Sequence, residues 1–294
     1  MQLRKSYMYY TSTIKPELCK KIIAHGLSKM VVDEAKGIPK EASTFDNKEK
    51  GGISKDGKTK VSDTLMSSGM TRETMAKKGI DIQNAYVRDS HISWLNDKWI
   101  YDILHPYVHH ANREAGWKWH WDYSESYQFT KYAKKQFYGW HADGSSDHLS
   151  IYKPAIKITT GKVPTFKPVK RDSNGKIILD ANGKGVPDMD KPNVPTDKKN
   201  KRLISGWTDN PHMWDKVRKI TMVLNLTNPD NYAGGNLKLD LGPHAGKKRF
   251  HVCQEIRPQG SIIIFPSFTY HCVTPVTRGT RYSLVNWCLG RPWY

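Results

Sequence analysis

The sequence predicts a mainly β fold of the antiparallel sandwich or jelly-roll kind, with helices contributed by its N-terminal third. Apolar and polar residues alternate with period two in several segments after Tyr123, which is the pattern of strands with one face in a core. Turn residues separate these short segments, as they do in sandwiches and jelly rolls. Apolar residues at helical spacing occur in two earlier segments.

The N-terminal third begins with a short predicted strand within residues 1–12. The first predicted helix starts near Pro16, a residue favoured in a first helical turn, and is expected to stop near Gly26. The second follows Asn96-Asp97, which can cap a helix, and Pro106 is expected to kink it. The apolar stripe of this second helix predicts packing against the core.

The remaining elements are strands joined by turns. Residues 38–65 are polar and contain a Gly pair, so we expect an exposed loop there. Strands are predicted at residues 127–132, 136–140, 219–227, 237–241, 261–265 and 281–287.

Bulk properties limit the classes of protein. A chain of 294 residues is long enough for one large domain, and we expect a single domain over residues 1–294. No apolar run is long enough to cross a membrane, so no membrane association is expected. Four Cys form no C-x-x-C pair, which favours reduced thiols and a cytoplasmic location. The net charge of +19 keeps nucleic acid open as a partner, but no DNA-binding motif accompanies it.

Residues 149–215 form a basic, proline-rich insertion within the predicted domain. They contain seven of the sixteen Pro, and Lys and Arg outnumber Asp there. The segment 176–184 could form a small hairpin with Ala-Asn-Gly at its tip. Two interpretations stay open, a lid or substrate surface and a solvated embellishment.

The pair His141 and Asp143 is the centre of the functional hypothesis. Residues two apart on a strand face the same side, so this imidazole and this carboxylate should lie together. With 12 His and 28 acidic residues, about one such pair is expected by chance. A second copy, His120-Trp-Asp122, is therefore a competing candidate.

The downstream residues His271 and Arg281 favour the first pair. His271 follows a buried strand and could complete a set of two His and one carboxylate, as in non-haem Fe(II) oxygenases. Arg281 lies on the next strand, where burial is costly unless its guanidinium meets a carboxylate. No acidic residue adjoins it in sequence, so a dicarboxylic co-substrate is an attractive partner.

These motifs resemble the prolyl-4-hydroxylase-like branch of the 2-oxoglutarate/Fe(II) dioxygenases, and most closely the PKHD-type hydroxylases, including versions carried by marine bacteriophages. The similar segments flank the insertion, over residues 1–148 and 216–294. They are Tyr132, Tyr138-Gly-Trp-His141-Ala-Asp143, Tyr232-Ala-Gly-Gly-Asn-Leu237, Gly260-Ser-Ile-Ile-Ile-Phe-Pro-Ser267, and His271 through Arg281-Tyr-Ser to Trp287.

The resemblance implies a double-stranded β-helix (jelly-roll or cupin-like) fold and an Fe(II) site made by His141, Asp143 and His271. It also implies that Arg281 binds the distal carboxylate of 2-oxoglutarate, with Tyr132 in that pocket and Trp287 lining it. The expected reaction hydroxylates a C–H bond with molecular oxygen and releases succinate and CO2, and the resemblance allows ascorbate as a reductant. A phage-encoded version would act in the host cytoplasm.

The family pattern also decides between the two His-x-Asp pairs, because His120-Trp-Asp122 falls where the family has no ligand. Oxygenases that demethylate nucleic acids have a different spacing, in which the arginine lies further downstream of the second histidine ligand. The favoured substrate is a prolyl or other residue of a protein or peptide. Two alternatives stay open, a hydroxylase of small molecules or free amino acids, and a non-catalytic nucleic-acid-binding module on the same fold.

Overall fold

The computed structural model describes residues 5–36, 88–143, 151–161, 163–196, 203 and 206–293. The predicted loop at 38–65 lies outside these residues. The chain divides into two compact units, described separately below. The first comprises Met1–Trp119, Ser124–Asp143 and Ile220–Trp287, and the second comprises His120–Tyr123, Gly144–Lys219 and Cys288–Tyr294. The interpretation as one domain stays a prediction.

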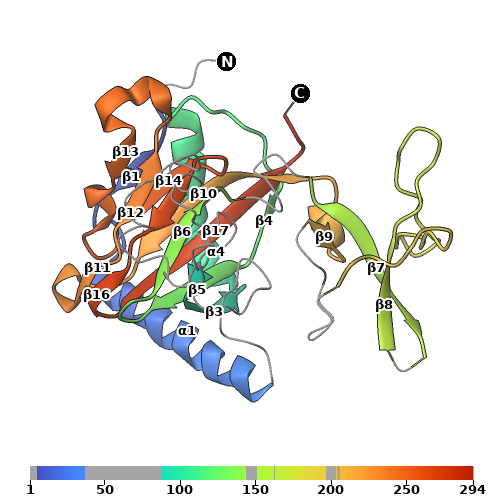
Figure 1. Ribbon diagram of the computed structural model, residues 1–294, viewed down its shortest axis with the longest axis horizontal. Coiled ribbons are helices and arrows are strands. Elements are labelled where there is room, and N and C mark those ends of the chain that lie inside the picture. The colour runs from blue at the N-terminus through green and yellow to red at the C-terminus, as the bar shows by residue number, and fades with distance from the viewer. Residues whose placement is uncertain are drawn as a thin grey trace, which may run out of the picture. The chain divides into compact units, whose positions relative to one another are not determined.

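Two antiparallel sheets dominate the first unit (Figure 1). In the described residues, the larger sheet has the strand order β1-β14-β10-β17-β5-β3, and β4 also pairs with β17. Its strands are β1 (Met8–Tyr10), β14 (Ile262–Pro266), β10 (Val217–Asn225), β17 (Arg281–Gly290), β5 (Tyr127–Tyr132), β3 (His91–Leu95) and β4 (Tyr123–Ser124).

In the described residues, the smaller sheet has the strand order β13-β12-β15-β6-β2, and β11 and β16 form a separate two-stranded sheet. Its strands are β13 (Phe250–Val252), β12 (Leu237–Asp240), β15 (His271–Val273), β6 (Phe137–His141) and β2 (Arg88–Asp89), and the separate pair is β11 (Tyr232–Gly234) with β16 (Val276–Gly279). Three short 3-10 helices connect strands of this unit at Pro229–Asn231, Pro243–Lys248 and Gln254–Ile256.

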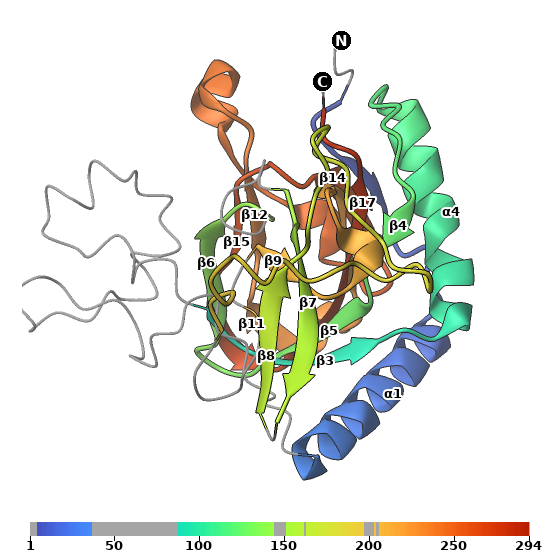
Figure 2. The same cartoon turned by 90° about the vertical axis from the view of Figure 1, so that its right-hand side faces the viewer.

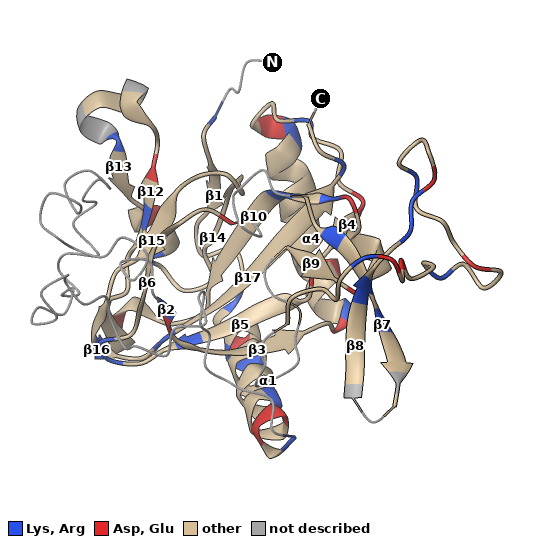
Figure 3. Ribbon diagram, turned by 45° about the vertical axis from the view of Figure 1, so that its right-hand side comes forward, with Lys and Arg blue, Asp and Glu red and all other residues tan. Residues whose placement is uncertain are grey.

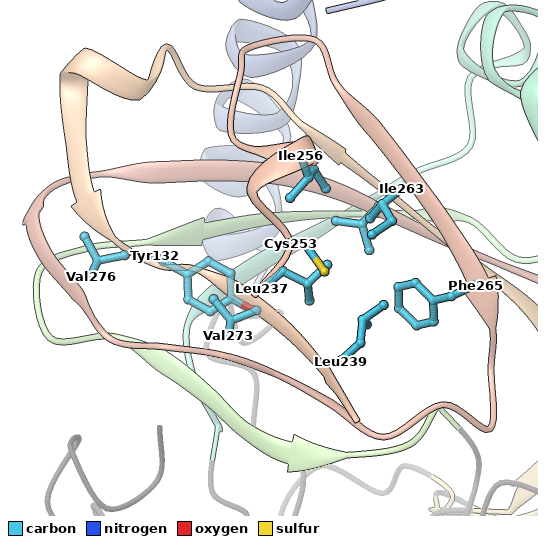
Figure 4. Packing of buried hydrophobic residues seen from close by; sticks show 10 residues of the cluster. Tyr132, Leu237, Leu239, Cys253, Ile256, Ile263, Phe265, Val273 and Val276 are labelled. Atoms are coloured by element: carbon cyan, nitrogen blue, oxygen red, sulfur yellow. The ribbon is translucent and has the colours of Figure 1, made fainter. Parts of the chain in front are cut away.

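Apolar side chains from both sheets form one core cluster (Figure 4). Figure 4 shows the ring of Tyr132, from the larger sheet, beside Leu237 and Val273 of the smaller one. Phe265 and Leu239 approach each other in the same way. The predicted strands therefore form a mainly β, double-layered fold, as the period-two alternation indicated.

Two helices cover the outer face of the larger sheet, α1 (Pro16–Ala35) and α4 (Lys98–Glu114), and both lie along one side of it in Figure 2. The prediction that α1 stops at Gly26 is wrong. A Cβ at Gly26 would lie 2.4 Å from the ring of Phe129, so this glycine allows the helix to pack closely on β5. Pro106 lies inside α4, as expected. In the described residues, no helix is long and apolar enough to cross a membrane.

The second unit contains most of the insertion and has ordered elements of its own. Strand β7 (Lys153–Thr160) pairs antiparallel with β8 (Val163–Pro168) and parallel with β9 (Trp207–Thr208), and a 3-10 helix follows at Pro211–Met213. A small core of Ala155, Phe166 and Val194 supports them.

The predicted hairpin of the insertion is confirmed by antiparallel bridging between Leu179 and Gly185. In the turn between them, the carboxylate of Asp180 accepts backbone N–H bonds from Asn182 and Lys184. Figure 3 shows that basic residues of both units are interspersed with acidic ones over helices, strands and turns.

Candidate metal centre

His141 and His271 lie side by side on neighbouring strands of the smaller sheet. They are direct cross-strand partners of β6 and β15, and their ring centres are 4.1 Å apart. The Nδ1 atom of His141 lies 2.8 Å from the carbonyl oxygen of Gly139, and that of His271 lies 2.9 Å from the carbonyl oxygen of Thr269. When Nδ1–H donates to a carbonyl, Nε2 of the same neutral ring carries the lone pair. Nε2 is then the atom that can bind a metal.

Asp143 completes the set, although not in the way that strand alternation predicted. Strand β6 ends at His141, so Asp143 lies in the bend that follows it. Its backbone N–H donates to the carbonyl oxygen of Ser267, at 2.9 Å, and its side chain is buried. The carboxylate oxygens lie 3.6 Å from Nε2 of His141 and 3.6 Å from Nε2 of His271.

The electrostatics of this group suit a divalent cation. Burial, and then the neighbouring His141, lowers the pKa of His271 to about 4, so its imidazole is neutral near pH 7. Neutral imidazoles with one carboxylate are the donor set of the facial triad. The three donor atoms lie within 4.8 Å of one another, and the residues therefore fit the predicted metal.

Thr221 holds the carboxylate in place, a residue that the sequence did not single out. Its hydroxyl donates to Oδ2 of Asp143 over 2.7 Å and lies 3.0 Å from the hydroxyl of Ser267. Both Thr221 and Ser267 are fully buried. Alternation on β10 indicated the polar face of Thr221, but only the pairing of β10 with β14 shows what that face meets.

Arg281 and Tyr132, the predicted co-substrate residues, are direct partners on β17 and β5. Both side chains are buried, and the guanidinium lies 5.7 Å from the centre of the Tyr132 ring. The guanidinium donates to the hydroxyl of Ser283, at 3.3 Å. In the described part of the chain no carboxylate pairs with it, although Arg281 is only 2% exposed.

Trp287, the third predicted pocket residue, lies further along β17 on the face that alternation shares with Arg281. Its indole is buried, and its ring lies 6.2 Å from that of Trp94. Its role in lining the co-substrate pocket stays a prediction.

Tyr138 joins the metal ligands through a β-bulge. Tyr138 and His141 would face opposite sides of a regular strand, but the register of β6 against β15 shifts between them. Their rings consequently stack, with centres 3.6 Å apart. This contact could not be predicted from alternation, because a bulge reverses the face of every residue beyond it.

The competing pair His120 and Asp122 forms no cluster of metal-binding atoms among the described residues. Asp122 instead forms an ion pair with Lys216, at 2.9 Å. A second described group, His251 with Cys253 and Glu255, has donor atoms close enough for a metal. Its His and Glu already bond to each other, and the hydroxyl of Tyr7 lies within hydrogen-bond distance of both.

Comparison with known proteins agrees with this geometry. Residues 197–289 match the family model described as the 2OG-Fe(II) oxygenase superfamily. A PKHD-type hydroxylase of Synechococcus sp. (strain CC9605) is 37% identical over 83 residues, which are 28% of this chain and 35% of that protein. The PKHD-type hydroxylase YbiX of Escherichia coli O1:K1 is 36% identical over 70 residues, 23% of this chain and 27% of that protein.

The chain thus spans only 35% and 27% of the length of these two curated relatives. A solved prolyl-4-hydroxylase of Pseudomonas putida is 14% identical, with a TM-score of 0.46 over 96% of this chain and 92% of that one. Residues 197–289 are therefore similar to the 2OG-Fe(II) oxygenase superfamily, and part of the chain is similar to PKHD-type hydroxylases.

Proposed function

We propose that the chain is a 2-oxoglutarate- and Fe(II)-dependent hydroxylase. Bound Fe(II) would supply the oxidation of a substrate C–H bond by molecular oxygen, coupled to conversion of 2-oxoglutarate into succinate and CO2. One observation carries the proposal: a set of two imidazoles and a carboxylate lies in the same unit as a buried arginine that has no carboxylate partner in the described residues.

In this proposal, His141, Asp143 and His271 hold the metal. Three protein donors leave coordination positions for other molecules, which a purely structural site does not require. The carbonyls of Gly139 and Thr269 fix the orientation of the two imidazoles. No protein general base is needed, because oxidation at the metal replaces proton abstraction.

Arg281 binds the far carboxylate of 2-oxoglutarate in the proposal, and Tyr132 lies beside that carboxylate. A guanidinium that is 2% exposed is costly to bury without an anion. A dicarboxylate offers the planar pair of oxygens that its fork matches. Ser283, which already contacts the guanidinium, helps to orient it.

A prolyl or other residue of a protein or peptide is the favoured substrate in this proposal, and the similar proteins are named as hydroxylases. A hydroxylase of small molecules or free amino acids is the second candidate. We further propose that ascorbate keeps the iron reduced and that the protein acts in a cytoplasm, consistent with four buried cysteines that form no disulfide. A nucleic-acid-binding module without catalysis is the remaining alternative, and its binding would fall steeply with salt.

The test measures Fe(II) binding and succinate release from 2-oxoglutarate by the full chain. Asp143→Ala and His271→Ala should lose both, because each removes one of three donors. His120→Ala, which changes the competing His-x-Asp pair, should retain both. Equal loss of metal from all three variants, or no Fe(II)-dependent succinate from the unaltered protein with any substrate, would refute the assignment.

A further inference from the structure

Arg88 provides a second guanidinium, on the inner side of the smaller sheet, whereas Arg281 lies on the larger sheet. It is the cross-strand partner of Tyr138, which is in turn the partner of Val273. Partners across antiparallel strands share a face, and Val273 belongs to the core cluster between the sheets. Arg88 therefore lies on the core-facing side of β2, where it is half-buried.

In the described residues, this guanidinium forms hydrogen bonds only to neutral groups. It donates to the hydroxyl of Ser90, to Oε1 of Gln128 over 2.7 Å and to the hydroxyl of Thr130. The carboxylate of its neighbour Asp89 accepts from the side-chain amide of Gln136, and no ion pair between Asp89 and Arg88 occurs among the described residues. The Nη1 atom makes no hydrogen bond within the described residues, so donor capacity and a full charge remain.

The position of Arg88 relates it to the metal centre. The guanidinium carbon lies 4.6 Å from the centre of the Tyr138 ring, which lies 3.6 Å from the centre of the His141 ring. The guanidinium is therefore no further from the His141 ring than the sum of these two distances. A small molecule can span such a gap, with a C–H bond at the metal and an anionic group at the arginine.

Arg257 provides an internal comparison. Its guanidinium also lies over a tyrosine, 4.2 Å from the centre of the Tyr232 ring, and also bonds to neutral oxygens. Those oxygens include the backbone carbonyls of Tyr232 and Gly234, so Arg257 ties down a turn. The Nη2 atom of Arg88 instead donates to two side chains of β5, Gln128 and Thr130, and to no backbone carbonyl in the described residues.

We propose that Arg88 recognises a carboxylate on the molecule that is hydroxylated. This inference rests on the proposed function and narrows its substrate class to compounds with an anionic group near the oxidised carbon. The carboxylate comes either from a free amino acid or from an acidic side chain of a peptide. Arg281 binds the far carboxylate of 2-oxoglutarate, so each of the two arginines binds a different anion.

The test compares matched pairs of compounds that differ only in charge. One arm uses free amino acids with their amides, and the other uses proline-containing peptides in which Asp and Glu are replaced by Asn and Gln. Succinate release and the mass gain of one oxygen are measured with Fe(II) and 2-oxoglutarate. The same pairs are titrated anaerobically into protein loaded with Mn(II) and 2-oxoglutarate, which measures recognition without turnover.

For at least one pair, the compound with the carboxylate should be turned over and bound about tenfold or more better than its neutral partner. This is the effect of a charge-assisted hydrogen bond. Arg88→Gln should remove that preference and leave the KM for 2-oxoglutarate unchanged. Arg88→Lys should restore part of it, because the charge remains while the fork is lost. Arg257→Gln, the matched control, should keep the preference.

The proposal would be overturned if no compound with a carboxylate were turned over or bound better than its neutral partner. It would also be overturned if Arg88→Gln lowered activity and affinity equally for acidic and neutral compounds. Preference in the binding titration without any turnover would count against the proposed hydroxylase alone. Turnover without preference would count against the role of Arg88 alone.

Discussion

Replacing Thr221 by Val tests whether the carboxylate of Asp143 is held in place for a metal. The change preserves the branched shape of the side chain and removes the hydroxyl that donates to Oδ2 over 2.7 Å. Both residues are buried, so water cannot replace the lost donor easily. Loss of a hydrogen bond to a charged group costs about 1.5–3 kcal/mol.

Metal affinity should fall about 10- to 100-fold, the usual effect of removing a partner that orients a ligand. At about 1.4 kcal/mol per tenfold, this range agrees with the hydrogen-bond estimate. The assay is anaerobic calorimetric titration of Fe(II) into the metal-free protein, with urea unfolding as a check of stability.

Thr227→Val is the matched control. Thr227 is also buried and follows the same strand, but its hydroxyl accepts from the backbone N–H of Tyr282. Both variants should lose stability, and only Thr221→Val should lose metal affinity. A Thr221→Val protein that binds Fe(II) within twofold of the unaltered chain would refute the reasoning.

Three further predictions follow from the contacts. Arg281→Ala should raise the KM for 2-oxoglutarate at least tenfold and leave Fe(II) affinity within threefold; equal loss of both would contradict a co-substrate role. Gly26→Ala should destabilise the protein by about 1 kcal/mol or more in urea unfolding, because the new Cβ meets the Phe129 ring. Phe129→Leu should relieve that penalty, and an unchanged penalty would contradict the packing. Burial raises the pKa of Glu255, but a backbone N–H, the Tyr7 hydroxyl and His251 outweigh it, so the pKa is lowered overall. The ionised Glu255 side chain should stabilise the folded protein above the pKa that it has in the unfolded chain, and this stabilisation should be lost as pH falls through its lower pKa in the folded protein. Glu255→Gln should therefore cost less stability at pH 3 than at pH 7, and an equal cost at both pH values would refute the linkage.

Elements with strong local patterns were predicted well. The alternation of Ile220, Met222 and Leu224 indicates a strand, and β10 contains all three. The segment from 281 to 287 is likewise contained in β17. Such patterns reflect the period of one strand, which depends only on neighbouring residues.

The limits appear where a local signal competes with packing. Gly26 is a common helix stop, yet α1 continues past it because the flat ring of Phe129 occupies the place of a side chain. Asp97 is a common cap, yet its carboxylate lies 2.7 Å from the ring of His25, and no side-chain cap bond forms at α4. In both cases a partner distant in sequence determines the outcome.

By itself, the sequence determined the residue types of the centre: His141, Asp143, His271 and Arg281 are recognisable from motif and spacing. Tertiary structure alone decided how they are held. The hydroxyl of Thr221 donates to the carboxylate of Asp143, and the bulge stacks the ring of Tyr138 on that of His141. Arg88, on strand β2, is the cross-strand partner of Tyr138. The physical reason is that spacing describes one strand, whereas register and bulges between strands decide which side chains meet.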